Sequence, residues 1–505
     1  MTNSITSYSR ENGGRVALLF LLFLLAIYQF IHAGFSAFAI VCMSPILVLS
    51  GYVIFKWRMS AFWLLIFINY FIQWKDFPST GLPTSLPNEV LQILLLGIAI
   101  IDARQTPHFE RCCNLMLLAI IIWCVFCTLE VLNDTCGLGI NWGAWYTGAR
   151  MFAFQLLYIF LVFSIYISSP EILRKYLIVW ACLALFSAFW TFKQQNIGLT
   201  QTEANFLRNS RTHVIQNGTL IRYFSTFSDA SNYGCNAAAS AIAFIIFGIT
   251  TKFKKERWFF LIVAALVIKS MFASGTRTAI FCLFAGGMVY IVLSKSVKIA
   301  TSATIVGIFA FFILAFTNIG QGNQQVRRMR SAFNRGDASA KTRDINQETM
   351  KKYMGDAPWG IGIGMGDYMD VPKNNKFWLM SKIPPDSDYI LIWLRTGRIG
   401  ITIFIISILI MFGGACYVVM FRLKHPSLVG IGGGLCCAFV AIQLGGYGNQ
   451  VLLQFPNCLI FYGGLAIVYI LPYIEPSWIE YEKKILAEQE EKKRLKLEKK
   501  LASRV

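Results

Sequence analysis

Long apolar segments alternate with short polar connections along almost the whole chain. Most of the apolar segments approach the roughly 20 residues that a helix needs to cross the hydrocarbon core of a bilayer. Only helices and closed barrels satisfy their backbone groups in that environment, and these segments lack strand-like alternation. The pattern therefore predicts an all-α fold, a polytopic transmembrane helical bundle of about 12–14 spans. The predicted spans are 16–31, 34–55, 60–74, 88–102, 113–131, 149–168, 173–192, 232–251, 257–273, 277–295, 299–318, 398–421, 428–448 and 454–474.

Two polar segments are much longer than the other connections: 193–231 and 319–385. Within the second, Ser339–Met354 predicts an amphipathic helix in which Ile345, Thr349 and Tyr353 share a face at helical spacing. Gly355 and Pro358 mark its end. The second segment is therefore predicted to be a large, partly helical loop.

These segments divide the chain into four parts. The expected parts are N-terminal transmembrane helices (1–318) that include the loop 193–231, the large loop (319–385), C-terminal transmembrane helices (386–475), and a charged tail (476–505) rich in Glu and Lys.

Composition supports a membrane protein, because 56% of the residues are hydrophobic and only 14% are charged. The net charge of +20 lies mainly in loops and in the tail, a distribution that orients membrane proteins and requires no nucleic acid. With the N-terminus in the cytoplasm, the short external loops hold only Lys75, Arg150 and Arg277. This asymmetry predicts a multi-pass protein with both termini cytoplasmic. The short cytoplasmic segments hold Arg10, Arg15, Lys56, Arg58, Arg104, Arg111, Arg174, Lys175, Lys252, Lys254, Lys255, Arg257, Lys295, Lys298, Arg422 and Lys424.

The large loop breaks this charge rule, because it is basic on the side where basic residues are scarce. An anionic partner would explain that excess, and anionic lipid headgroups would attract the loop as well. Arg277 is the most specific of the external arginines, since it lies in a short turn between two apolar segments. Three arginines, Arg222, Arg277 and Arg343, are candidates to bind a diphosphate through bidentate hydrogen bonds, although Arg343 is also consistent with a solvated surface side chain. The basic residues of the loop include Arg327, Arg328, Arg330, Arg335, Arg343, Lys351 and Lys352.

An acidic turn, Pro384-Pro385-Asp386-Ser387-Asp388, leads into the next apolar segment. Asp386 or Ser387 can cap the helix that begins there, and both aspartates favour a helix N-terminus. Alternatively, one carboxylate acts as a base near the membrane surface, or the pair holds a divalent cation. Residues two apart do not share a helix face, so a cation site requires Asp386 outside the helix.

Two further motifs have simpler structural interpretations. The glycines of Gly360-Ile-Gly-Ile-Gly-Met-Gly366 follow no predicted strand, so close backbone approach explains them better than nucleotide binding. Cys124 and Cys127 form a C-x-x-C motif inside a predicted span, where they are expected to pack as small hydrophobic residues.

The order of these motifs resembles that of the bacterial O-antigen ligase and O-antigen polymerase superfamily. The resemblance runs from Arg222, Asp229 and Asn232 through the turn Ser274-Gly-Thr-Arg277 and the large loop to the segment that ends at Gly400. It implies a glycosyltransferase of the inner membrane that takes a glycan from undecaprenyl diphosphate and needs no cofactor. No metal site is assigned. Its expected partners are the lipid-linked donor, an acceptor glycan or glycolipid, membrane lipids and a chain-length regulator.

The resemblance also implies roles for individual residues. Arg222, Arg277 and Arg343 would bind the donor diphosphate, and we expect Asp386, assisted by Asp388, to serve the acceptor hydroxyl. Ligases of the superfamily usually carry a His-Asn pair where this chain has Asp386-Ser387, which favours a polymerase. A ligase and a lipid-linked-glycan transporter remain the alternatives, and His213 is a second candidate base.

Overall fold

The computed structural model divides into two units, 1–64 and 65–505, which are described separately. In the first unit, helical positions between residues 14 and 56 and the start of one further helix are described; the predicted spans 16–31 and 34–55 lie largely outside the described residues. The helices and the site described below belong to the second unit, apart from the start of the helix that crosses residue 64. The structure describes residues 14, 17–18, 20–21, 23–24, 28, 52, 56–77, 85–102, 109–209, 214–215, 220–317, 322, 324–330 and 338–502.

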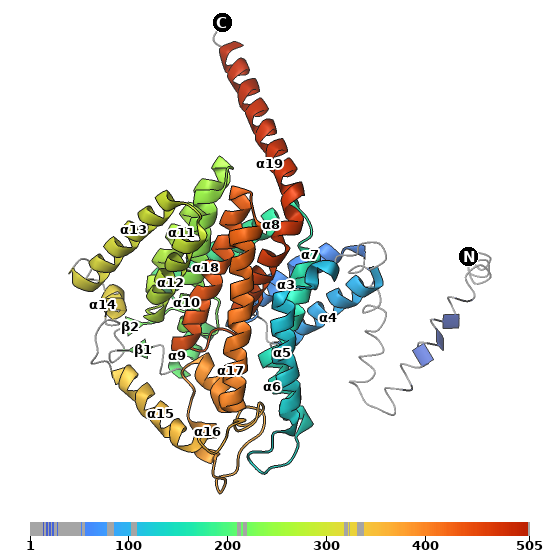
Figure 1. Cartoon of the computed structure of the whole chain (residues 1–505), viewed down its shortest axis with the longest axis vertical. Helices are drawn as coiled ribbons and strands as arrows, with labels where there is room; N and C mark the ends of the chain where they lie inside the picture. The colour runs from blue at the N-terminus through green and yellow to red at the C-terminus, as the bar shows by residue number, and fades with distance from the viewer. Residues whose placement is uncertain are drawn as a thin grey trace, which may run out of the picture. The chain divides into compact units, whose positions relative to one another are not determined.

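The second unit is built almost entirely of helices (Figure 1). The short strands β1 (Val214–Ile215) and β2 (Leu220–Ile221) pair antiparallel in the segment 193–231. The longer helices are α3 (Arg58–Phe71, which begins in the first unit), α4 (Leu86–Ile101), α5 (Leu115–Leu129), α7 (Gln155–Tyr166), α8 (Pro170–Asn196), α10 (Ala230–Thr250), α11 (Lys254–Ala273), α12 (Thr278–Leu293), α13 (Val297–Phe316), α15 (Ala338–Met354), α17 (Asp388–Tyr417), α18 (Pro426–Gly448) and α19 (Gly463–Ala502). The shorter ones are α6 (Trp142–Ala149), α9 (Gln201–Asn209), α14 (Gln324–Arg330), α16 (Trp378–Lys382), and the 3-10 and π-helical turns η2 (Phe109–Cys112), η3 (Glu130–Leu132), η4 (Arg150–Phe154), η6 (Val418–Arg422) and η7 (Cys458–Tyr462).

Among the described residues, seven helical segments are long and apolar enough to cross a membrane, and α3, α4 and α12 are shorter apolar helices. Every predicted span from 60–74 onward overlaps a helix. The predicted fold class, an all-α polytopic bundle, is confirmed. We call the helix ends near segments 193–231 and 319–385 the loop side of the bundle.

Helices α10 and α18 lie at the centre of the bundle, and small residues let their neighbours approach closely. A Cβ on Gly434 of α18 would lie 2.6 Å from the ring of Phe247 on α10. A Cβ on Gly286 of α12 would lie 3.1 Å from the carbonyl oxygen of Cys437 on α18. Such positions are typical of helix packing within membranes, where close backbone contact replaces the hydrophobic driving force.

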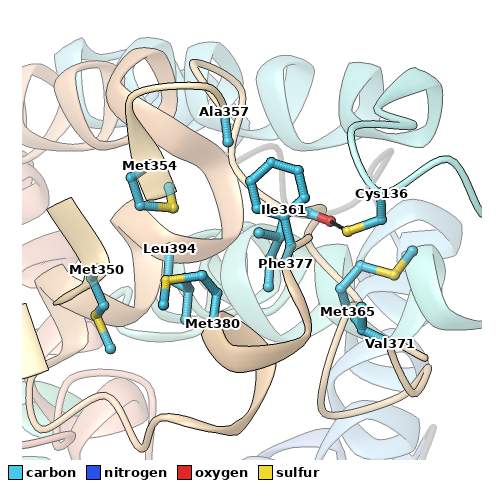
Figure 2. Close-up of a cluster of buried hydrophobic side chains, with 10 residues drawn as sticks. All are labelled: Cys136, Met350, Met354, Ala357, Ile361, Met365, Val371, Phe377, Met380 and Leu394. Atoms are coloured by element: carbon cyan, nitrogen blue, oxygen red, sulfur yellow. Dashed lines mark hydrogen bonds between the residues drawn. The ribbon is translucent and has the colours of Figure 1, made fainter. Parts of the chain in front are cut away.

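The large loop folds back onto the bundle around a cluster of buried apolar side chains (Figure 2). Helix α15 agrees with the predicted helix, and of the predicted face Tyr353 packs against the cluster whereas Ile345 does not. Met350 and Met354 are buried, whereas Ile345 is 63% exposed. The cluster comprises Cys136, Met350, Met354, Ala357, Ile361, Met365, Val371, Phe377, Met380 and Leu394.

Candidate active site

The turn between α11 and α12 collects arginine side chains on the loop side. Arg222 donates from Nε to the carbonyl oxygen of Ser274 (3.3 Å). Its NH2 donates to the hydroxyls of Thr276 (3.1 Å) and Ser231 (2.9 Å). Gly275, at the tip, has φ +58°, a left-handed conformation that favours glycine. These bonds hold one edge of the guanidinium group against the turn.

A second arginine reaches the same turn from the large loop. Arg328 of α14 donates from Nε to the carbonyl oxygen of Gly275 at 2.8 Å. Its neighbour Arg327 is exposed. Sequence reasoning counted Arg328 only among the basic residues of the loop, because residue type does not distinguish adjacent arginines.

The remaining predicted arginines have different positions. Arg277 lies in the same turn, half-buried, at the N-terminus of α12. Arg343 lies in α15, and its side chain is outside the described part of the chain. The structure thus brings Arg222 and Arg277 together at one turn.

The acidic turn precedes α17 on the same side of the bundle. Ser387 caps this helix by accepting the amide of Tyr389 (3.2 Å), as the sequence predicted for Asp386 or Ser387. The Ser387 hydroxyl also donates to the carbonyl oxygen of Gly446 (2.9 Å). Asp386 is exposed.

Asp388 differs from Asp386, because it is only 2% exposed. Its Oδ2 accepts the backbone amides of Val451 (2.6 Å) and Leu452 (2.8 Å). Hydrogen bonds to two amides stabilise a buried carboxylate and fix the segment that donates them. Asp388 therefore holds the chain that follows α18 in place through these two hydrogen bonds.

The end of α18 and the chain that follows it, Gly446 to Leu452, link the acidic turn to the turn between α11 and α12 (residues 274–277), which we call the arginine turn. On one side this segment bonds Ser387 and Asp388, as described above. On the other, the side-chain amide of Asn449 donates to the hydroxyl of Thr278 at 3.0 Å, one residue beyond Arg277. We name residues 446–452 the bridging segment.

The N-terminus of α10 completes the polar floor of this region. Asp229 caps α10 by accepting the amides of Ser231 (2.7 Å) and Asn232 (3.0 Å). Lys75 donates to the carbonyl oxygen of Ser228 at 3.0 Å. Burial lowers the pKa of Lys75, and the negative charge of Asp229 opposes that shift.

Buried asparagines connect α10 with the chain after the bridging segment. Asn457 donates to the side-chain oxygen of Asn232 (2.6 Å) and to the carbonyl oxygen of Val451 (2.9 Å). Asn236 donates in turn to the side-chain oxygen of Asn457 (2.8 Å). Satisfied networks of this kind fix geometry in a low-dielectric interior.

The glycine-rich segment packs against protein backbone. The amides of Ile361 and Gly362 donate to the carbonyl oxygens of Leu394 (3.0 Å) and Arg395 (3.1 Å) on α17. A Cβ on Gly364 would lie 2.5 Å from the carbonyl carbon of Ala144 on α6. The structure thus agrees with the prediction that these glycines allow close backbone approach, since their backbone lies against that of α17 and α6.

The same segment carries an ion pair to α17. The NH2 group of Arg395, which is 2% exposed, donates to Asp367 at 2.7 Å. Gly366 makes room for this guanidinium group, since a Cβ there would lie 2.8 Å from its NH1. The pair fixes the large loop on the helix that follows Asp386.

Metal ligands are not gathered in this region. Within the described ranges no group of three or more His, Cys, Asp and Glu side chains is placed to hold a metal ion. Cys124 and Cys127 are buried and free, in agreement with their expected packing role.

Residues 262–405 match the model of a known protein family that is described as O-antigen ligase. This range contains the arginine turn, the large loop, the acidic turn and the first part of α17. No curated protein matches the chain. The match supports a membrane enzyme of the O-antigen ligase type. Over residues 262–405 the chain is therefore similar to the O-antigen ligase family, which supports the superfamily resemblance of its motifs.

Proposed function

We propose that this chain is a glycosyltransferase that takes a glycan from undecaprenyl diphosphate and extends a surface polysaccharide. The observation that carries the proposal is the bridging segment, which bonds the acidic turn at Ser387 and Asp388 and the arginine turn at Thr278. A cationic site for a leaving group and an exposed carboxylate for an acceptor are what such a transfer requires. On the topology inferred from charge, the loop side faces away from the cytoplasm.

The arginines bind the donor diphosphate in this proposal. When an acceptor hydroxyl attacks the anomeric carbon, the bond between that carbon and the phosphate oxygen breaks. The diphosphate leaves with additional negative charge, and Arg222, Arg277 and Arg343 stabilise it. Arg328 supports the site by fixing the carbonyl of Gly275. No nucleotide is needed, because lipid diphosphate is the leaving group.

Asp386 is the proposed base. Its exposed carboxylate orients the acceptor hydroxyl and takes its proton as the new glycosidic bond forms. Asp388 assists indirectly by holding the bridging segment in place. The ion pair between Arg395 and Asp367 keeps the large loop close to this helix end.

A polymerase fits the acidic turn best, and a ligase is the second candidate. The family description names ligases, which supports transfer to a lipid A core sugar. The Asp386-Ser387 pair stands where the resemblance leads one to expect His-Asn, which supports transfer to another lipid-linked repeat unit. A deletion strain separates the two, since loss of a ligase leaves full-length polymer unattached, whereas loss of a polymerase leaves single repeat units.

The roles of the arginines are tested by Arg277→Ala and Arg343→Ala in such a strain, at matched expression. We expect both variants to shorten the polysaccharide. Arg327→Ala is the matched control, because Arg327 is an exposed arginine of the same loop. Normal chain lengths in both test variants would contradict the assigned roles.

A further inference from the structure

A cavity of about 170 Å³ lies between α8 and α11, at their ends on the loop side. Phe192 of α8 and Leu266 of α11 line it and are 49% and 43% exposed. Phe189, also in the lining, is 60% exposed. We call this cavity the α8–α11 groove. Its exposed apolar rim is suited to a hydrocarbon ligand.

The floor of the groove leaves little for water to bind. Thr191 is 1% exposed, and its hydroxyl donates to the carbonyl oxygen of Ser187 at 2.9 Å. The hydroxyl of Ser270 donates to Val267 (2.9 Å) and accepts from Tyr233 (2.7 Å). Because these polar groups are already satisfied, the floor is effectively apolar.

The α11 side of the groove carries one cationic side chain. Lys269 lines the groove and is exposed, and within the described part of the chain it has no hydrogen bond or ion pair. Ala273, the last residue of α11, also lines the groove, and the next residue is Ser274, whose carbonyl binds Arg222. The helical rise puts Lys269 roughly 7 Å along the axis from Ser274. One end of the groove therefore lies next to the arginine turn.

We propose that the α8–α11 groove binds the polyprenyl chain of the lipid diphosphate, at the isoprene units nearest the headgroup. This proposal rests on the proposed function and extends it to the lipid part of the donor. Charge complementarity selects the occupant, since Lys269 and the arginine turn would meet the two phosphates of one lipid. A cavity of about 150 Å³ holds a benzene molecule in another protein, so this groove has room for about one isoprene unit. The rest of the chain would extend into the bilayer.

The test is photocrosslinking of the full-length protein with a polyprenyl diphosphate that carries a diazirine in the isoprene unit next to the diphosphate. We expect adducts on residues 185–195 of α8 and 266–273 of α11. Unlabelled undecaprenyl diphosphate should displace the probe, and phosphatidylglycerol at the same concentration should not. Lys269→Gln should reduce labelling several-fold, whereas Lys269→Arg should retain it. Lys298→Gln is the matched control, because Lys298 is an exposed lysine of α13.

Two results would overturn the proposal that the α8–α11 groove binds the polyprenyl chain. Adducts that map elsewhere while undecaprenyl diphosphate still displaces the probe would reject this location and leave the proposed function intact. Equal displacement by phosphatidylglycerol would identify a general lipid surface. Failure of the proposed function gives a different result, in which Lys269→Gln and the arginine variants all build polysaccharide of normal length. The Ala188→Phe variant fills the groove with a larger side chain and should reduce labelling without any change of charge. The thermal unfolding midpoint of this variant shows whether it is folded.

Discussion

Arg222 and Arg328 meet at one glycine. A Cβ on Gly275 would lie 3.1 Å from Cδ of Arg328 and 3.5 Å from Cγ of Arg222. Each arginine donates to a carbonyl of the same turn, Arg222 to Ser274 and Arg328 to Gly275. The first long loop and the large loop are thus fixed to a single hairpin of the bundle, beside Arg277.

Substitutions of the adjacent residues Arg327 and Arg328 can be compared directly for their effect on glycan transfer. We expect Arg328→Ala to lower glycan transfer about tenfold or more, because a hydrogen bond from a charged donor contributes about 1.5–3 kcal/mol. Arg327→Ala should leave transfer near the wild-type level. Initial rates on equal amounts of folded protein provide the measurement. Equal losses in the two variants would indicate that only the general charge of the loop matters.

A methyl group at the tip of the turn should disturb both arginines. Gly275→Ala requires alanine in a left-handed conformation, which costs roughly 1–2 kcal/mol, and it crowds Arg328. We expect a lower unfolding midpoint and a marked loss of transfer. Gly287→Ala in α12 is the control, because a Cβ there meets nothing within 4 Å. A Gly275→Ala enzyme as stable and active as Gly287→Ala would show that the turn has no such role.

Most of the architecture follows from local signals. The spans could be predicted because apolar length is read directly from the sequence, and Ser387 could be predicted as a cap because its chemistry is local. Arg328 could not be chosen over Arg327, since only the folded loop decides which arginine reaches Gly275. Of the residues of α15 that pack on the bundle, Tyr353 was on the predicted face, but Met350 and Met354 were not predicted, because the surface on which they pack is provided by other segments.

Substitutions of the two aspartates of the acidic turn should have different effects on activity and stability. Asp386→Asn removes an exposed base, so we expect normal stability and a loss of roughly 10²–10⁴ in rate. Asp388→Ala leaves the amides of Val451 and Leu452 without their acceptor, at a cost of about 1–3 kcal/mol each. Its unfolding midpoint should therefore fall. A stable, inactive Asp388→Ala together with an active Asp386→Asn would reverse the assignment.

The reactivity of the Cys136 thiol reports whether the glycine-rich segment is packed in place. Cys136 is 7% exposed, and its thiol donates to the carbonyl oxygen of Ile361 (3.3 Å). Burial raises the pKa of Cys136 to about 11, so at neutral pH the unreactive thiol form prevails. A membrane-impermeant maleimide should therefore label it slowly, and faster as the pH rises towards 11.

Gly364→Ala should increase that labelling about tenfold or more, because overpacking against Ala144 costs about 1–3 kcal/mol. Gly355→Ala should not, since a Cβ there meets nothing within 4 Å. A Cys136→Ser variant gives the background. Unchanged labelling in Gly364→Ala would show that the segment does not protect Cys136.

Purified protein in liposomes shows whether the chain itself transfers a glycan from lipid diphosphate. The liposomes contain an undecaprenyl-diphosphate-linked repeat unit, and the products are analysed by mass spectrometry. We predict chains of two or more repeat units, with one undecaprenyl diphosphate released for each bond formed, and little product from Arg277→Ala. Movement of the lipid-linked unit across the bilayer without any new glycosidic bond would identify a transporter instead, and equal product from Arg277→Ala would exclude the proposed role of Arg277.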